Sequence, residues 1–397
     1  MTDLLGETIV RDATPLRRSV SLLGIGTASP PTLSQLDAAA VSEEFSCQSD
    51  GQRAWLRRVF SHSGVEQRGS VLKTGAGLAE LRAFYGPPAE AGLRGPTTAI
   101  RMTRYAAEAP VLAERAARAA LEASGVAPRR ITHLITVSCT GFYAPGLDVE
   151  LTGRLDLRPD VRRVHIGFMG CHAAFNALGA AKDAVTADPS ARVLVCCVEL
   201  STLHFAYGWN PEKLVANALF ADGASACVVG AENDENRKVH GDVPRGWRLI
   251  ETASLLLPDS RDAMTWRIGD HGFEMTLSAE LPALIGRHLR SWCESWLSKA
   301  GLALPDVRYW AIHPGGPKIL AAAGEALGIG EPDLRASRQI LAQHGNMSSA
   351  TLLFLLNRLL QNRKSGDEQE AKEGGHRPCA AIGFGPGLMA EGLLLEM

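Results

Sequence analysis

Short apolar runs bounded by glycine, proline or polar residues alternate along the chain with longer segments of helical character. The runs that predict buried strands lie at 131–138, 161–168, 191–200, 247–257, 307–313, 379–384 and 389–396, and another strand begins at Ser19 and ends before Pro30. The helical segments lie at 111–124, 173–187, 281–300, 318–327 and 349–362. Strands that alternate with helices are typical of an α/β protein, and we expect a mostly parallel central sheet.

The order of these elements occurs twice. Each half has a buried strand that leads into a Gly/Pro turn, ITHLITVSCTG in the first half and VRYWAIHPGGP in the second. We expect each half to end in a β-hairpin with small residues at its bend, FADGASA within 219–230 and FGPGLMA near the C-terminus. The sequence therefore predicts an internal duplication. The expected parts are a polar N-terminal arm at 1–18, a first half at 19–235, a polar linker within 231–245 and a second half at 246–397.

The composition is that of an ordinary globular protein. Apolar residues make up 46% of the 397 residues and charged residues 21%, which excludes a disordered chain. The net charge of −2 gives no basic surface for nucleic acid or anionic lipid. No apolar run approaches the ~20 residues of a membrane span. We therefore expect neither a nucleic-acid partner nor a membrane partner.

The cysteines and short motifs indicate the compartment and argue against bound groups. Eight cysteines are too sparse for a disulfide scaffold, and the N-terminus lacks the apolar segment of a secretion signal. We therefore expect reduced thiols in a cytoplasmic protein. There is no HExxH or paired CxxC motif, and GIGTAS at 24–29 lacks the spacing of a dinucleotide-binding loop. We expect no metal and no cofactor.

Cys171 lies where a strand ends and a buried helix begins, in HIGFMGCHAAFNALGAA. The helix dipole and free backbone N–H groups lower the pKa of a thiol at that position, which favours a nucleophile. A packed structural cysteine is the alternative. Its neighbour His172 is expected to pack or to face the surface.

Three further segments could complete a site around a nucleophilic cysteine. His313 ends the apolar strand WAIH, and side chains at strand C-termini point into the ligand crevice of α/β sheets; a turn histidine is the alternative. Asn346 lies just before an apolar helix, where an N-cap role is a sufficient explanation. GFGPG is a glycine-rich bend whose backbone, at Gly383, Gly385 and Gly387, could approach a ligand.

Together these segments resemble the chalcone-synthase-like, or type III polyketide synthase, family. The resemblance runs from about residue 20 onward and rests on Cys171, HPGGPKIL at 313–320, GNMSSATLL at 345–353, LFADGASA at 219–226 and GFGPGL at 383–388. It implies the thiolase-like fold, with two duplicated βα halves that form a five-layered αβαβα core, and a homodimer. It also implies an acyltransferase that takes an acyl-CoA starter and malonyl-CoA as substrates.

The resemblance implies a catalytic role for three residues. Cys171 would be acylated by the starter, His313 would hold it as thiolate and donate to the thioester carbonyl, and Asn346 would donate a second hydrogen bond to that oxygen. Decarboxylation of malonyl-CoA leaves an enolate, whose oxygen two neutral or cationic donors stabilise. The enolate attacks the acyl thioester in a Claisen condensation, and cyclisation then gives a pyrone or a resorcinol-type phenolic product.

The resemblance also identifies residues along the substrate path. Phe220 matches one of two gatekeeper phenylalanines, and Met275 stands at the other, where a flexible apolar side chain implies a looser gate. Arg58 matches a basic position for CoA. Arg57 is a substitute candidate, because the family's two lysine positions in this segment are occupied by Trp55 and His62.

Further residues are implied to shape the cavity. Four of them contribute polar atoms: Cys139, Thr140, Ser201 and Ser348. Three others set its size. Ala144 matches a position that is often methionine and reaches across the dimer, so it leaves space for a long acyl chain. His204 and Trp266 are bulky where plant enzymes have small residues. We expect restricted elongation, with two or three condensations.

Two other functions compete with this interpretation. A ketoacyl-ACP synthase III shares the fold and the Cys/His/Asn set, but HPGGP and GFGPG point away from it, and a basic patch for an acyl carrier protein is not evident. A non-catalytic scaffold would be expected to lose the cysteine or its partners, and all three are present.

Overall fold

Nine strands form the largest sheet of the computed structural model, which describes residues 19–73, 75, 77–86, 95–232, 246–366 and 377–397. Neighbouring strands follow the order β11 (Tyr309–Ile312), β12 (Pro378–Gly385), β13 (Met389–Glu396), β8 (Arg248–Leu256), β1 (Val20–Ala28), β7 (Asp222–Ala231), β6 (Arg192–Leu200), β4 (His133–Ser138) and β5 (Arg162–Gly167). β1 and β8 pair only through Ser21 and Arg248. The sheet is therefore two sheets joined at one point.

The strand order repeats in these two sheets. β1, β7, β6 and β4 have the same order and relative directions as β8, β13, β12 and β11, with two antiparallel pairs followed by a parallel pair. β5 adds one more parallel strand to the first set. The predicted mostly parallel sheet is wrong, because five of the eight neighbouring pairs are antiparallel. An apolar run shows that a strand is buried and carries no signal of its direction.

The first of the two predicted hairpins is also wrong. β7 runs as a single strand between β6 and β1, because its small residues allow close packing where a bend was expected. Gly223, for example, lies directly against the Met347 side chain and leaves no room for a Cβ. The second hairpin is confirmed, with β12 and β13 antiparallel from Pro378–Glu396 to Gly385–Met389.

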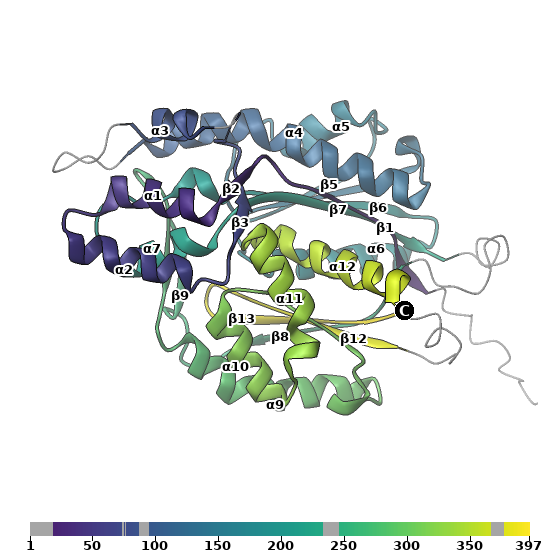
Figure 1. Cartoon of the computed structure of the whole chain (residues 1–397). Helices are drawn as coiled ribbons and strands as arrows, with labels where there is room; N and C mark the ends of the chain where they lie inside the picture. The colour runs from purple at the N-terminus through teal and green to yellow at the C-terminus, as the bar shows by residue number, and fades with distance from the viewer. Residues whose placement is uncertain (1–18, 74, 76, 87–94, 233–245, 367–376) are drawn as a thin grey trace, which may run out of the picture.

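Helices cover the outer faces of the two sheets and fill the space between them. α4 (Thr98–Ser124) packs on β1, β7 and β6. α6 (Ala173–Ala187) contacts strands of both sheets, and α12 (Thr351–Gly366) lies beside it; α9 (Leu281–Lys299) and α10 (Pro317–Leu327) lie outside the second sheet (Figure 1). The alanine-rich sequence of α6 suits a helix whose first half is buried, although Ala180, Asp183, Thr186 and Ala187 are exposed in its second half. The α/β class and the five-layered core of two duplicated halves are thus confirmed.

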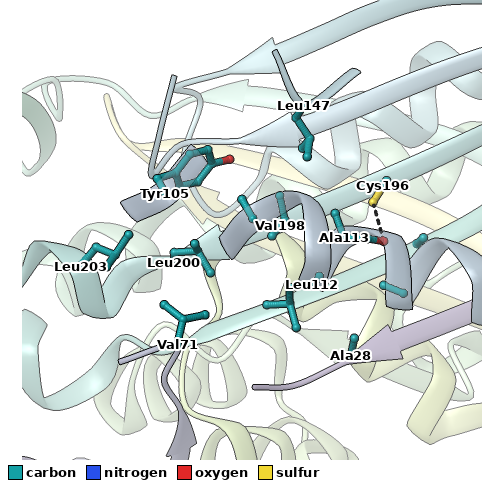
Figure 2. Packing of buried hydrophobic residues seen from close by; sticks show 14 of the residues in the cluster. Ala28, Val71, Tyr105, Leu112, Ala113, Leu147, Cys196, Val198, Leu200 and Leu203 are labelled. Atoms are coloured by element: carbon teal, nitrogen blue, oxygen red, sulfur yellow. Dashed lines mark hydrogen bonds between the residues drawn. The ribbon is translucent and has the colours of Figure 1, made fainter. Parts of the chain in front are cut away.

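The core of the first half lies between α4 and the first sheet. Leu112 and Ala113 of α4 meet Val198 and Leu200 of β6 in one apolar cluster (Figure 2). Cys196 packs in the same cluster as a small apolar residue, and its thiol donates to the Ala113 carbonyl at 3.7 Å. All eight cysteines are free thiols.

The other α-helices and strands of the described part of the chain were not predicted. They are α1 (Gln35–Ser46), α2 (Asp50–Ser61), α3 (Ala79–Tyr85), α5 (Leu147–Arg154), α7 (Pro211–Leu219), α11 (Glu331–His344), and the two-stranded sheets of β2 (Thr32–Ser34) with β3 (Gln67–Gly69) and of β9 (Met264–Gly269) with β10 (Gly272–Leu277). Several of them surround the site described below.

Two of the predicted segments fall on residues that the structure leaves out. The N-terminal arm at 1–18 and residues 233–245 of the predicted linker lie outside the described residues. The boundaries of the two halves at 235 and 246 therefore stay predictions. Among the described helices, none is long and apolar enough to cross a membrane.

Candidate active site

Cys171 lies in the tight turn between β5 and α6. Phe168 and Gly170 both adopt positive φ there, at 59° and 85°. Only glycine fits at position 170, because the ring of Pro386 occupies the place of a Cβ. The turn places Cys171 two residues before Ala173, the first residue of α6, at the end where the parallel strands of the first sheet finish.

The position at the helix start predicts a lowered pKa for Cys171, but burial has the larger effect. Cys171 is 6% exposed, and burial raises its pKa to about 11. Hydrogen bonding by Ser348 and Asn346 lowers the pKa by less, and the charge of Glu199 raises it further. The thiol is therefore protonated at neutral pH in the free protein, and the thiolate that the resemblance implies has to be formed by a base.

Asn346 lies next to the sulfur. Its side-chain Oδ1 and Nδ2 are 3.9 Å and 4.0 Å from Cys171 Sγ. The Ser348 amide donates to Oδ1 at 2.9 Å, so the NH₂ group is the part left for a ligand. Asn346 does not cap α12, which begins at Thr351. The N-cap alternative from the sequence is therefore wrong, and the amide is held by the turn at 346–348 instead.

His313 directly follows β11 and is almost fully buried. Among the described residues, neither Nδ1 nor Nε2 has a hydrogen-bond partner. Burial lowers its pKa to about 4, although the Asn346 amide beside it acts in the opposite direction. A buried polar group without a partner is costly in a native structure and calls for an explanation. The neutral imidazole can both accept a proton and donate one.

Glu199 is a buried carboxyl group of this site that was not predicted. It accepts hydrogen bonds from the Cys139 amide at 3.1 Å, from Thr140 Oγ1 at 2.8 Å and from Ser349 Oγ. Burial raises its pKa. The signal for it was available in the sequence, since a lone acidic residue near the end of the apolar run RVLVCCVEL is unusual. It fixes the polar groups on one side of the nucleophile.

Two cavities with lining residues in common lie at the site, and Cys171 lines the inner one. The inner one has a volume of about 20 Å³ and is lined by Cys139, Thr140, Gly170, Cys171, Ser201, Phe220, Met264, Trp266, Met275, Ser348 and Pro386. The outer one has a volume of about 300 Å³ and lies between α7, β10 and residues 201–207. Four residues line both cavities: Ser201, Phe220, Trp266 and Met275. The two residues predicted as gatekeepers therefore lie at the border between the cavities.

His204 and Trp266 are held rigidly by the backbone near Cys139. Trp266 Nε1 donates to the Cys139 carbonyl at 2.7 Å. His204 Nε2 lies 2.7 Å from the Thr140 carbonyl and its Nδ1 accepts from the Phe273 amide, so Nε2 carries the proton. The His204 ring also stacks on Phe273 at 4.3 Å, and burial lowers its pKa to about 3. Both side chains are thus fixed in place and bulky.

Other predicted residues lie away from the two cavities. Ala144 is exposed and lines neither of them. Gly383 and Gly385 are covered by the rings of Phe175 and His172, which leave no room for a Cβ. Gly387, with φ 94°, also lies outside both cavities. The GFGPG bend thus packs against the start of α6, and only its proline reaches the inner cavity.

The two arginines of α2 differ in their surroundings. Arg57 makes a two-pronged ion pair with Glu43, at 2.6 Å and 2.7 Å. Arg58 is exposed and has no ion pair within the described part of the chain. One turn before it, Trp55 packs edge to face with Trp209, with ring centroids 5.1 Å apart.

Comparisons with known proteins agree with this geometry. The family model of chalcone and stilbene synthases matches the chain over its N-terminal domain at 10–233 and its C-terminal domain at 248–397. The α-pyrone synthesis polyketide synthase-like Pks18 of Mycobacterium tuberculosis is 33% identical over 376 residues, which is 94% of this chain and 90% of that protein. The Pks18 protein of Mycobacterium bovis matches equally well.

Solved structures show the same likeness. PKS-I from the brown alga Ectocarpus siliculosus superposes with a TM-score of 0.86 at 29% identity, covering 97% of this chain and 100% of that one. The C-terminal type III polyketide synthase domain of Steely1 from Dictyostelium superposes with a TM-score of 0.82 at 26% identity, covering 95% and 99%. These likenesses set aside the ketoacyl-ACP synthase III alternative. The chain belongs to the chalcone and stilbene synthase family and is a type III polyketide synthase, an acyltransferase.

Proposed function

We propose that Cys171 carries the growing chain and that His313 and Asn346 activate the two substrates. The observation that carries this proposal is the pair of unpartnered ring nitrogens of His313, buried next to the Asn346 side-chain amide, whose nitrogen lies 4.0 Å from the Cys171 sulfur. No neighbouring group of the described chain uses them, so they are available to a substrate.

Loading begins with a proton transfer. The neutral His313 imidazole accepts the proton of the Cys171 thiol, and the sulfur attacks the carbonyl carbon of the acyl-CoA. The bond to the CoA sulfur breaks, and the departing CoA thiolate takes the proton back from His313. The acyl group is then a thioester on Cys171, and both His313 and Asn346 are again free to donate hydrogen bonds.

Extension uses the same two donors. Malonyl-CoA loses carbon dioxide, and the electron pair of the broken carbon–carbon bond becomes an enolate whose oxygen accepts hydrogen bonds from His313 and Asn346. The enolate carbon attacks the acyl thioester, and the Cys171 sulfur leaves. The product is a chain two carbons longer on CoA, which returns to the sulfur for the next round.

The small volume of the inner cavity supports a small number of condensations. The inner cavity holds about one water molecule. The fixed ring of Trp266 lines it and packs edge to face with the fixed ring of His204 at 5.8 Å, which prevents the cavity from widening. We place the starter chain in the outer cavity, which is lined by Phe205, Tyr207 and Phe273 among others. After two condensations the chain can close through an enol oxygen to a pyrone, and a carbocyclic phenol requires a third. We therefore favour a pyrone.

CoA binding is assigned to the face of α2 that carries Arg58. Its guanidinium is unpaired and exposed, and Trp55 with Trp209 offers an aromatic surface next to it. The α2 helix packs on α7, which leads from Trp209 to the gate at Phe220. Arg57 is less suited, because Glu43 already neutralises it.

We also propose a homodimer formed through β5. This strand lies at the edge of the sheet, and large apolar side chains around it are exposed, namely Phe142 (36%), Val149 (44%), Val164 (51%) and Met169 (40%). An open strand edge with apolar neighbours is a typical self-association surface. Ala144 lies in the loop beside this surface, so it would approach the partner copy. The free thiols favour a cytoplasmic location.

The test is a panel of acyl-CoA starters, from acetyl to long-chain and aromatic, incubated with malonyl-CoA and the purified protein. We expect pyrones by mass spectrometry, and none with Cys171→Ala. Turnover that requires malonyl-ACP, or products that survive Cys171→Ala, would contradict the proposal.

A further inference from the structure

Arg68 of β3 has a guanidinium group that is fully buried behind the gate. Nη1 donates to the carbonyls of Asn217 and Phe220, both at 2.7 Å, and Nη2 donates to the carbonyl of Ala218 at 2.5 Å. Nη2 also donates to Gln35 Oε1. The three carbonyls lie at the C-terminal end of α7, where helix carbonyls lack partners within the helix. One side chain therefore closes the end of the helix that leads to the gate.

The same segment is bonded to the catalytic asparagine. The backbone N–H of Asn346 donates to the Leu219 carbonyl at 2.9 Å, and the backbone N–H of Ala221 donates to the backbone carbonyl of Asn346 at 2.9 Å. The Phe220 backbone lies between these two bonds and gives its own carbonyl to Arg68. Arg68, the gate and Asn346 thus form one hydrogen-bonded unit.

Burial of the Arg68 guanidinium costs free energy, so its presence in the core calls for an explanation. Arg68 is 0% exposed, and burial lowers its pKa to about 9 although Asp222 lies close by. The Asp222 carboxylate is itself engaged by the amides of Val71 and Thr202, at 2.9 Å and 2.7 Å. A buried charge of this kind is weak evidence for stability but can fix one geometry. Only the planar fork of arginine can bond three backbone carbonyls and an amide oxygen at once.

We propose that Arg68 is a positioning residue for decarboxylation. By holding the carbonyl of Phe220, it fixes the backbone bridge that carries Asn346, and so it sets where the Asn346 NH₂ group meets the enolate oxygen. The gate then opens through its side chain, while its backbone stays in place. This inference rests on the proposed roles of Phe220 and Asn346. It does not concern Cys171, which is attached to a different element, the start of α6.

Arg101 provides a matched control for a purely structural role. It is also 0% exposed and donates to backbone carbonyls, those of Pro96 at 2.9 Å, Phe205 at 3.3 Å and Leu203. It has no hydrogen bond to the gate segment or to Asn346. Arg68→Lys and Arg101→Lys keep the charge and remove the fork in both places.

Two assays separate an effect on the position of Asn346 from an effect on the stability of the protein. The first is release of carbon dioxide from malonyl-CoA, which depends on Asn346. The second is alkylation of Cys171 by iodoacetamide, to which Asn346 contributes only a lowering of the thiol pKa that is smaller than the effect of burial. For Arg68→Lys we expect decarboxylation to fall about tenfold, as for a modest misplacement of a catalytic group, with alkylation within about twofold of the unchanged protein. For Arg101→Lys we expect a similar loss of thermal stability and decarboxylation within about twofold.

A second variant tests the inference in case Arg68→Lys does not fold. Gln35→Met removes one acceptor of the guanidinium and keeps its charge, and we expect the same selective loss of decarboxylation, about threefold. The inference is overturned if the Arg68 and Arg101 variants lose decarboxylation equally, or if Gln35→Met has no effect. Absence of malonyl-CoA decarboxylation in the unchanged protein would instead contradict the proposed function itself.

Discussion

Replacement of Trp266 by alanine should lengthen the product. The indole lines both cavities and is fixed by its 2.7 Å hydrogen bond to the Cys139 carbonyl. Without it, the inner cavity of about 20 Å³ opens into the outer one of about 300 Å³, at least a fifteenfold increase. Each condensation adds two carbons and an oxygen, more than the single water that the inner cavity holds. With a fixed starter we expect at least one additional condensation in Trp266→Ala.

The stability cost of this change should be tolerable. Trp266 is partly exposed, so we expect a loss of about 3 kcal/mol, at the low end for removal of a large aromatic side chain. Trp292→Ala is the control, because Trp292 is partly buried against the same apolar cluster and lines neither cavity. The assay is the product distribution by liquid chromatography and mass spectrometry. An unchanged distribution in Trp266→Ala would refute the reasoning that this ring limits elongation.

Three further predictions address other parts of the account. Asn346→Asp places a carboxylate at the enolate oxygen, so malonyl-CoA decarboxylation should fall about 10²- to 10³-fold while Cys171 still reacts with iodoacetamide; a loss below tenfold would count against the role. Burial, with Arg358 nearby, lowers the pKa of His344 to about 4. The buried neutral imidazole therefore contributes to the folding stability above pH ~6.5, and this contribution is lost as the pH falls towards 4. When the pH is lowered from 7 to 4, the free energy of unfolding in urea should therefore fall by about 3 kcal/mol more for the unchanged protein than for His344→Gln. The same pH dependence in both proteins would contradict this. Val164→Asp should give monomers in sedimentation equilibrium, and a persistent dimer would place the interface elsewhere.

The residues with local sequence signatures could be found from the sequence. Cys171, His313 and Asn346 each stand in a distinctive segment, and the structure brings Asn346 to within 4 Å of the sulfur and next to His313. The gate positions, Phe220 and Met275, were likewise identified and lie at the border of the two cavities.

The features that were missed depend on the whole fold. The direction of the strands is set by pairing between distant segments, and an apolar run does not reveal it. Glu199 and Arg68 act through contacts with residues up to 152 positions away. The pKa of Cys171 was predicted with the wrong direction, because the effect of a helix start is local and visible in sequence, while burial depends on everything that surrounds the sulfur.

The most direct test of the central claim is to locate the acyl group on the enzyme. The protein is incubated with one acyl-CoA starter in the absence of malonyl-CoA, digested and examined by mass spectrometry. We predict a single acyl adduct on Cys171, and none on Cys139, the other thiol that lines the inner cavity. An adduct on another cysteine, or product formation without an acylated Cys171, would contradict the account.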